Sequence, residues 1–317
     1  MKVSTRFAVY AALALVGMAA SAVPAMAADP GLNGRISFAS PVAGSLQVFT
    51  MNPDGSGVKQ LTSSATGANS INSDWSPDGE QIAFDSDRTG AIDVFTMRSD
   101  GSDVHQVTHM GGFSVGPSWS PDGRRLVFAH FPAPGVCCTN LWRVNAAGTA
   151  LHQLTHFTVE TFAGEPEFSP DGRWIAFQEF PNDLHPPFLS AIFVMRANGT
   201  EMRQVTPLQL DAGHPEWSPD GSRIIFNNDF TQPAAGDIFT IRPSGTGLTQ
   251  LTSVSSIGEA DFRPDYSPDG TKIVFNQFIP VQPTKVLVMN ADGSGAHVIN
   301  SNGFAPDWGS RPESSDE

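Results

Sequence analysis

Short stretches of alternating apolar residues recur along most of the chain, and none of them has helical spacing. A β-prone triplet ending in Phe occurs five times, at 82–84, 126–128, 175–177, 224–226 and 273–275. A second alternating stretch follows each triplet, as in Val94-Phe95-Thr96-Met97, and a third ends in Gln-Leu/Val-Thr, as in Gln106-Val107-Thr108. Such segments, separated by turn residues, are typical of β-strands. The pattern predicts an all-β protein.

A Ser-Pro-Asp-Gly turn sets the repeat. It begins at residues 76, 120, 169, 218 and 267, with spacings of 44, 49, 49 and 49 residues. An aromatic residue precedes each copy, and Trp308 marks a sixth position: Trp75, Trp119, Phe168, Trp217, Tyr266 and Trp308. In Pro-Asp-Gly, Pro presets φ, Asp bonds its own backbone and Gly takes a left-handed conformation, so these Asp residues are predicted to form turns. Four short strands per unit are typical of a propeller blade.

The two ends of the chain contain complementary parts of one further unit. Residues 34–62 carry the second, third and fourth strands of a unit, whereas Pro306-Asp307-Trp308 supplies a first strand alone. Joining them in one sheet closes a ring without an open edge. The sequence therefore predicts a six-bladed β-propeller of four-stranded antiparallel blades over 28–309, closed by a composite N/C-terminal blade, with a polar disordered tail at 310–317.

The first residues are typical of a secretory signal peptide over 1–27. Lys2 and Arg6 precede an apolar run from Phe7 to Met18, and Ala25-Met26-Ala27 fits a cleavage site. No other run approaches the roughly 18 apolar residues that a membrane span needs. We therefore expect a monomer that is periplasmic or secreted, without a transmembrane span. The net charge of −14 repels phosphate backbones, which excludes nucleic acid as an expected partner.

The cycle Trp-Ser-Pro-Asp-Gly, Ile-x-Phe, Met-x-x-Asp-Gly-Ser and Gln-Leu-Thr resembles the WD-like repeat of the TolB propeller domain, found in a periplasmic component of the Tol-Pal envelope system. The resemblance covers nearly all of the chain after residue 27 and implies the fold more specifically than the function. TolB proteins carry an α/β domain before the propeller, and this sequence is expected to lack it. Similar repeats occur in prolyl-oligopeptidase-type peptidases, and neither their hydrolase domain nor its Gly-x-Ser-x-Gly motif is expected in this chain.

An acidic position lies directly before the aromatic residue of nearly every unit. Five of the six residues there are acidic, the exception being Ser118: Asp74, Glu167, Glu216, Asp265 and Asp307. The first strand of a blade lines the channel of a propeller, so these carboxylates are expected to converge there and to favour a bound Ca²⁺ or Mg²⁺. The alternative is that each carboxylate accepts hydrogen bonds from a neighbouring blade or turn.

A second Phe follows the second strand of four successive units and gives a candidate partner-binding surface. These residues are Phe131, Phe180, Phe230 and Phe278. The loops after the second strands share one face of a propeller, where Phe and Pro side chains suit a protein or peptide partner. The alternative is that the rings pack onto their own blades.

The cysteine and histidine residues give weaker indications of a functional site than the acidic and Phe positions. Cys137 and Cys138 are the only cysteines, and they form either a strained vicinal disulfide or two thiols. The eight histidines, including His214 beside the channel position Glu216, lack metal-ligand spacing.

Nothing in these patterns marks an enzyme. The sequence favours an exported, non-catalytic protein-binding or scaffold module of the cell envelope or extracellular space. The alternative is a metal-dependent hydrolase or lyase with its site at the channel mouth, for which an open metal site among converging carboxylates would be the distinguishing feature.

Overall fold

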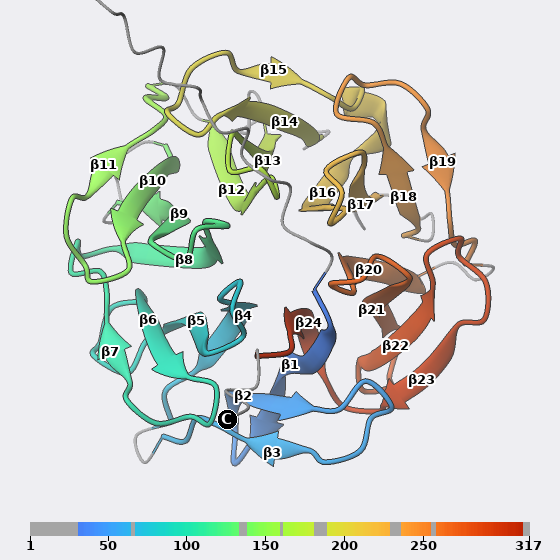
Figure 1. The fold of residues 1–317 in the computed structure, drawn as a ribbon, viewed down its shortest axis with the longest axis horizontal. Helices are drawn as coiled ribbons and strands as arrows, with labels where there is room; N and C mark the ends of the chain where they lie inside the picture. The colour runs from blue at the N-terminus through green and yellow to red at the C-terminus, as the bar shows by residue number, and fades with distance from the viewer. Residues whose placement is uncertain are drawn as a thin grey trace, which may run out of the picture.

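Six sheets surround a central axis in the computed structural model (Figure 1). It describes residues 31–64, 67–132, 138–158, 161–180, 189–228, 236–254 and 258–312. Each sheet has four strands, and neighbouring strands are antiparallel. The predicted six-bladed propeller is therefore confirmed. The predicted signal peptide, 1–27, lies outside the described residues.

Blades 1 to 5 follow chain order, each running from the channel outward. Blade 1 contains β4 (Ser70–Trp75), β5 (Gln81–Ser86), β6 (Asp93–Arg98) and β7 (His105–Gln106). Blade 2 contains β8 (Phe113–Trp119), β9 (Arg125–Phe131), β10 (Asn140–Asn145) and β11 (His152–Gln153). Blade 3 contains β12 (Phe162–Phe168), β13 (Trp174–Phe180), β14 (Ala191–Arg196) and β15 (Arg203–Gln204).

The next two blades repeat this order. Blade 4 follows a 3₁₀ turn (Leu208–Leu210) and contains β16 (Ala212–Trp217), β17 (Ile224–Asn228), β18 (Ile238–Ile241) and β19 (Thr249–Gln250). Blade 5 contains β20 (Ala260–Tyr266), β21 (Lys272–Phe278), β22 (Lys285–Asn290) and β23 (His297–Asn300). Among the described residues, no helix is long and apolar enough to cross a membrane.

The closing blade joins the two ends of the chain. It contains β24 (Phe304–Ser310), β1 (Asn33–Val42), β2 (Ser45–Met51) and β3 (Lys59–Gln60), in that order. Ile36 lies opposite Trp308 in the β1–β24 pairing, and both side chains are buried. The predicted composite closure is confirmed. β24 includes Ser310, which the sequence had placed in the tail, and residues 313–317 lie outside the described residues.

The Ser-Pro-Asp-Gly turns connect the first two strands of each blade. In blade 3, Ser169 Oγ donates to Asp171 Oδ1 at 2.6 Å and accepts from the Trp174 N–H at 2.9 Å. Gly172 has φ 66°, where a side chain would add strain. The Ser–Asp bond recurs in all five turns. These Asp residues are therefore turn-formers, as predicted, and we call this side of the ring the turn face.

The Gln-Leu/Val-Thr segments hold the outermost strands, which have only two residues in most blades. In blade 1, Thr108 Oγ1 accepts from the Val94 N–H at 2.9 Å and donates to Asp93 Oδ1 at 2.8 Å. Gln106 Nε2 donates to the Thr108 carbonyl at 2.9 Å. The Thr bond recurs in four other blades, so side chains replace the backbone pairs that a short strand lacks.

The core lies between adjacent blades. One fully buried Phe occupies each second strand: Phe38, Phe84, Phe128, Phe177, Phe226 and Phe275. Ala176 and Ile192 of blade 3, for example, pack with Trp217 and Phe226 of blade 4. Each blade thus shares its buried apolar surface with the next, which couples the stability of the blades around the ring.

Candidate functional site

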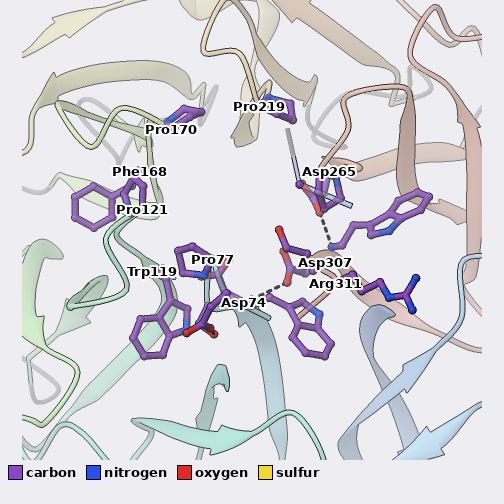
Figure 2. Close-up of a pocket in the computed structure, with 18 of the residues that line it drawn as sticks. Asp74, Pro77, Trp119, Pro121, Phe168, Pro170, Pro219, Asp265, Asp307 and Arg311 are labelled. Carbon is purple, nitrogen blue, oxygen red and sulfur yellow. Dashed lines mark hydrogen bonds between the residues drawn. The ribbon is translucent and has the colours of Figure 1, made fainter. Parts of the chain in front are cut away.

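The central channel opens widely on the turn face. A cavity of about 1100 Å³ lies there, with prolines at its rim and aromatic side chains on its walls (Figure 2). The rim prolines come from the five repeated turns and from the C-terminal segment: Pro77, Pro121, Pro170, Pro219, Pro268 and Pro312. All five predicted carboxylates, Asp74, Glu167, Glu216, Asp265 and Asp307, line this cavity. We call these five residues the acidic ring.

The three aspartates of the acidic ring connect adjacent blades. Asp74 Oδ2 accepts from the Trp119 N–H at 2.6 Å, and Asp265 Oδ2 accepts from the Trp308 N–H at 2.6 Å. Asp307 Oδ2 accepts from the Trp75 N–H at 2.9 Å. Figure 2 shows the bonds of Asp265 and Asp307. Hydrogen bonding to a neighbouring blade, the alternative to cation binding, therefore accounts for these three side chains.

The two glutamates have a different environment. Among the described residues, no hydrogen-bond partner is found for the carboxyl group of Glu216. Burial and the charges of Glu167, Asp265 and the other ring carboxylates hold its pKa well above the usual range. Burial likewise raises the pKa of Glu167 to about 8, although Ser118 hydrogen-bonds its side chain. Burial also raises the pKa of Asp307 to about 7. The acidic ring is therefore expected to hold protons near neutral pH.

A second ring lies deeper in the channel. Its members stand two residues before the channel position in each blade, and all have φ between 48° and 58°: Asn72, Gly116, Glu165, His214, Arg263 and Ala305. They line a chamber of about 70 Å³. The β-bulge at this point shifts the register in every first strand and turns these side chains into the channel. We call them the bulge ring.

The bulge ring was not predicted from the sequence, although the positions of the prolines contained a signal for it. In five units a proline follows the bulge residue, as in Glu165-Pro166-Glu167. Proline cannot donate to a sheet ladder, so within sheets it is confined to edge strands, strand starts and bulges; the recurring proline was therefore a signal for an irregular edge strand at this position.

Arg263 bridges the bulge ring across the channel. Its Nη1 donates to Asn72 Oδ1 of blade 1 at 3.1 Å, and its Nη2 donates to Glu165 Oε1 of blade 3 at 3.2 Å. Burial would raise the pKa of Glu165, but Arg263 and His214 hold it below its ordinary value. Burial and the Arg263 charge lower the pKa of His214 to about 4, so this imidazole is neutral. The chamber at this bridge, about 70 Å³, is much smaller than the turn-face cavity of about 1100 Å³.

The chemistry of the channel fits a metal poorly. Among the described residues, no three His, Cys, Asp or Glu side chains are grouped as metal ligands. His214 is the one histidine among the residues that line either channel cavity, and its Nδ1 lies 3.1 Å from Asn227 Oδ1. Binding of Ca²⁺ or Mg²⁺ by the acidic ring stays a prediction.

The side of the ring opposite the turn face, which we call the loop face, carries an aromatic row. Phe162 contacts Phe131 and Phe180, with ring centroids 4.8 Å and 5.3 Å apart, and so joins blades 2 and 3. Phe131, Phe180 and Phe278 are the last residues of β9, β13 and β21. The sequence had placed them in the loops beyond these strands, which is wrong because the ladders extend one pair further, as in Phe162–Phe180. Phe230 lies outside the described residues.

Exposure differs within this aromatic set. Phe131 is half-buried and packs on the core between blades 2 and 3, whereas Phe278 is 37% exposed. Phe113, which the sequence reading did not select, is 42% exposed and lies opposite Phe131 in the β8–β9 pairing. Phe131 thus packs between two blades, whereas Phe278 is partly exposed; binding of a partner by these side chains stays a prediction.

Only one residue of the cysteine pair lies within the described part of the chain. Cys138 takes part in a disulfide, whereas Cys137 lies outside the described residues. The vicinal pairing stays a prediction.

The expectation that this chain lacks a Gly-x-Ser-x-Gly motif is wrong, because one copy is present in the sequence. Residues 112–116, Gly-Phe-Ser-Val-Gly, match the Gly-x-Ser-x-Gly nucleophile motif, which requires an exposed Ser on a strand-to-helix turn. Ser114 instead lies within β8, is fully buried and has its Oγ 3.1 Å from Nδ1 of His130, its cross-strand neighbour. The motif here is a buried polar pair between two strands.

Comparison with known proteins agrees with this architecture. The family model described as TolB beta propeller domain matches residues 15–178 and 140–313. No match was found among curated proteins. TolB from Acinetobacter baumannii has a TM-score of 0.71 and 18% identity, covering 88% of this chain and 67% of that chain.

Two further solved structures show how widely the fold is shared. Putative TolB from Agrobacterium tumefaciens has a TM-score of 0.67 and 18% identity, covering 86% of this chain and 91% of that chain. An oligogalacturonate lyase in complex with manganese has a TM-score of 0.54 and 16% identity, covering 84% and 74%. At these identities the structures share the fold alone. The family model spans most of the sequence, and the chain therefore belongs to the TolB β-propeller domain family.

Proposed function

We propose that this chain is an exported, non-catalytic protein-binding or scaffold module of the cell envelope or extracellular space, and that it binds a protein or peptide through its loop face. The aromatic row on blades 2 and 3 carries the proposal. Aromatic side chains that pack on one another keep a fixed geometry and provide large apolar area at little entropic cost, which is the usual composition of a binding hot spot.

The channel side chains support a non-catalytic role. The aspartates of the acidic ring bond to neighbouring blades, and Arg263 and Glu165 bond to each other. Groups paired in this way connect different blades, which gives these side chains a structural role without catalysis. The likeness to TolB supports an envelope location.

The test targets the aromatic side chains that are exposed among the described residues: Phe113, which lies opposite Phe131 of the aromatic row, and Phe278 of blade 5. Phe113→Ser and Phe278→Ser together should reduce capture of a cross-linked envelope partner at least tenfold, since an aromatic anchor contributes about 2 kcal/mol or more. Phe131 is unsuitable because its ring packs on the core. Unchanged capture by a variant that melts like the parent would contradict the proposal.

A control on the same face is available in blade 1. Thr89 is exposed, so Thr89→Ser should leave both capture and melting unchanged. Its neighbours are less suitable. The Arg88 guanidinium lies 4.9 Å from the ring centroids of both Phe84 and Phe95, and Asp87 Oδ1 accepts from the Asn69 N–H at 2.6 Å, so changing either would disturb the blade.

The alternative, a metal-dependent hydrolase or lyase at the channel mouth, is supported by the size of the turn-face cavity, about 1100 Å³, and by its acidic floor. An oligogalacturonate lyase in complex with manganese has the same general fold. A metal-stimulated hydrolytic or lyase activity that Glu167→Gln and Glu216→Gln abolish would favour this alternative over the binding module.

A further inference from the structure

The turn between β21 and β22 has an unusual residue at its tightest point. The Gln282 N–H donates to the Ile279 carbonyl at 3.1 Å, which makes Pro280 and Val281 the central residues. Val281 has φ 62°. A turn with Pro second and a positive φ third is of type II, and its third position is normally Gly or Asn. A β-branched residue there strains the backbone.

Val281 is also fully exposed, more than any other large hydrophobic residue among those that the structure describes. The isolated propeller therefore gains no burial from this side chain and bears the strain of its backbone. Equivalent turns in other blades have no β-branched residue at positive φ: Ala43 (φ 50°) and Gly44 (φ 91°) connect β1 to β2, and Gly90 (φ 97°) lies between β5 and β6.

The tip is rigid as well as apolar. Pro280 and Pro283 flank Val281 and fix φ at two positions, and the Ile279–Gln282 hydrogen bond closes the turn. Phe278, at the base of the turn, is 37% exposed. A projection that is ordered before binding loses little conformational entropy when it is buried.

We propose that Val281, presented by the strained turn 279–282, is an anchor that inserts into an apolar pocket of a partner protein. This inference rests on the proposed binding role of the loop face and names the residue that would make its most buried contact. A single apolar side chain that projects from a rigid turn is complementary in shape to a concave pocket in a protein. The net charge of −14 repels anionic bilayers, which favours a protein over a lipid surface.

The strain makes a sharp test possible because binding and stability should change in opposite directions. Val281→Gly and Val281→Asn relieve the strain, so the melting temperature should stay equal or rise by about 2 °C or more. The same variants remove the apolar anchor, so affinity for the purified partner should fall at least tenfold. A variant that binds like the parent overturns the inference.

The partner is identified by a photo-crosslinking amino acid placed at position 281 of the full chain in its native compartment. We expect one discrete adduct with one protein, whereas the same probe at Ala43, in an exposed turn on the same face, should give none. Equal adducts from both positions overturn the inference. So does binding of the parent protein to neutral phosphatidylcholine vesicles that Val281→Gly abolishes.

The outcomes separate this inference from the proposed function. If Phe113→Ser with Phe278→Ser abolishes capture and Val281→Gly does not, only the anchor role fails. If neither variant changes capture, the binding role of the loop face fails, and the anchor role fails with it.

Discussion

Replacing Glu167 with Gln should stabilise the protein at alkaline pH and leave it unchanged at acidic pH. Glu167 lies in the acidic ring, and burial raises the pKa of its carboxyl from 4.5 to about 8. Gln has nearly the same shape and still offers Ser118 an acceptor. The substitution therefore removes the buried charge without removing the packing or the hydrogen bond.

The direction in which stability changes with pH follows from the difference in proton binding between the folded and unfolded states. The folded state holds its Glu167 proton up to about pH 8, whereas the unfolded chain releases it near pH 4.5, so the folded state is favoured below pH 4.5 and loses stability as the pH rises to about 8. A tenfold change in proton affinity is worth about 1.4 kcal/mol, which sets a ceiling of about 5 kcal/mol. Because the Glu167 side chain is only half-buried, solvent screens part of its charge, and we expect about 2 kcal/mol.

The assay is thermal melting of parent and Glu167→Gln at pH 5 and pH 8.5. We expect closely similar melting temperatures at pH 5, and at pH 8.5 an advantage of roughly 4 to 8 °C for the variant. The titration of His214 cancels because both proteins contain it. Glu80→Gln is the matched control, since Glu80 lines the same cavity but is exposed; its melting difference should not change with pH. A constant difference for Glu167→Gln at both pH values would refute buried charge as the cause.

Two further predictions concern ring closure and the cation. Deleting 304–317 should lower the melting temperature of the whole domain by more than about 10 °C, because β1 and the Ile36 side chain lose β24 and Trp308; melting like that of the parent would contradict closure by the composite blade. Millimolar Ca²⁺ at pH 8 should raise the melting temperature of the parent if the acidic ring binds it, and should have no effect on a variant carrying Glu167→Gln and Glu216→Gln. Equal curves with Ca²⁺, Mg²⁺ or chelator would remove the cation hypothesis.

The sequence predicted the blades well because their signals are local. A Ser-Pro-Asp-Gly turn closes its own hydrogen bonds within five residues, as the Ser169 turn does, and the alternating stretches on either side contain the ladder residues. The closing blade could also be predicted, since residues 34–62 lacked the first strand of a unit and the C-terminal end supplied a first strand alone.

The channel could be predicted only in part, because its contacts join residues that are far apart in sequence. Arg263 bonds to Asn72, 191 residues away, and alternation within one strand contains no information about which side chains meet across an axis. The carboxylates of the acidic ring were found because they share a repeat position. The aspartates accept hydrogen bonds from the next first strand around the ring, whereas Glu167 is bonded by Ser118 and Glu216 has no side-chain bond among the described residues; the shared repeat position does not predict this difference.

Side-chain exposure on the loop face was equally inaccessible to sequence. Phe131 and Phe278 occupy the same position in their repeats, yet the first packs on a core and the second is 37% exposed, since the neighbouring blade differs. The Gly-Phe-Ser-Val-Gly segment illustrates the same limit. A motif written in letters has chemical meaning only where the backbone turns and exposes its Ser.

The closing blade also bears on how such a chain can be rearranged. The Arg311 N–H donates to the Leu32 carbonyl at 2.7 Å, so the two described ends lie side by side on the turn face. A short linker could therefore connect them, and a new start could be opened at a surface turn such as Ala43-Gly44 without changing any strand pair. The same six blades should therefore form from a chain whose first residue lies at a different turn.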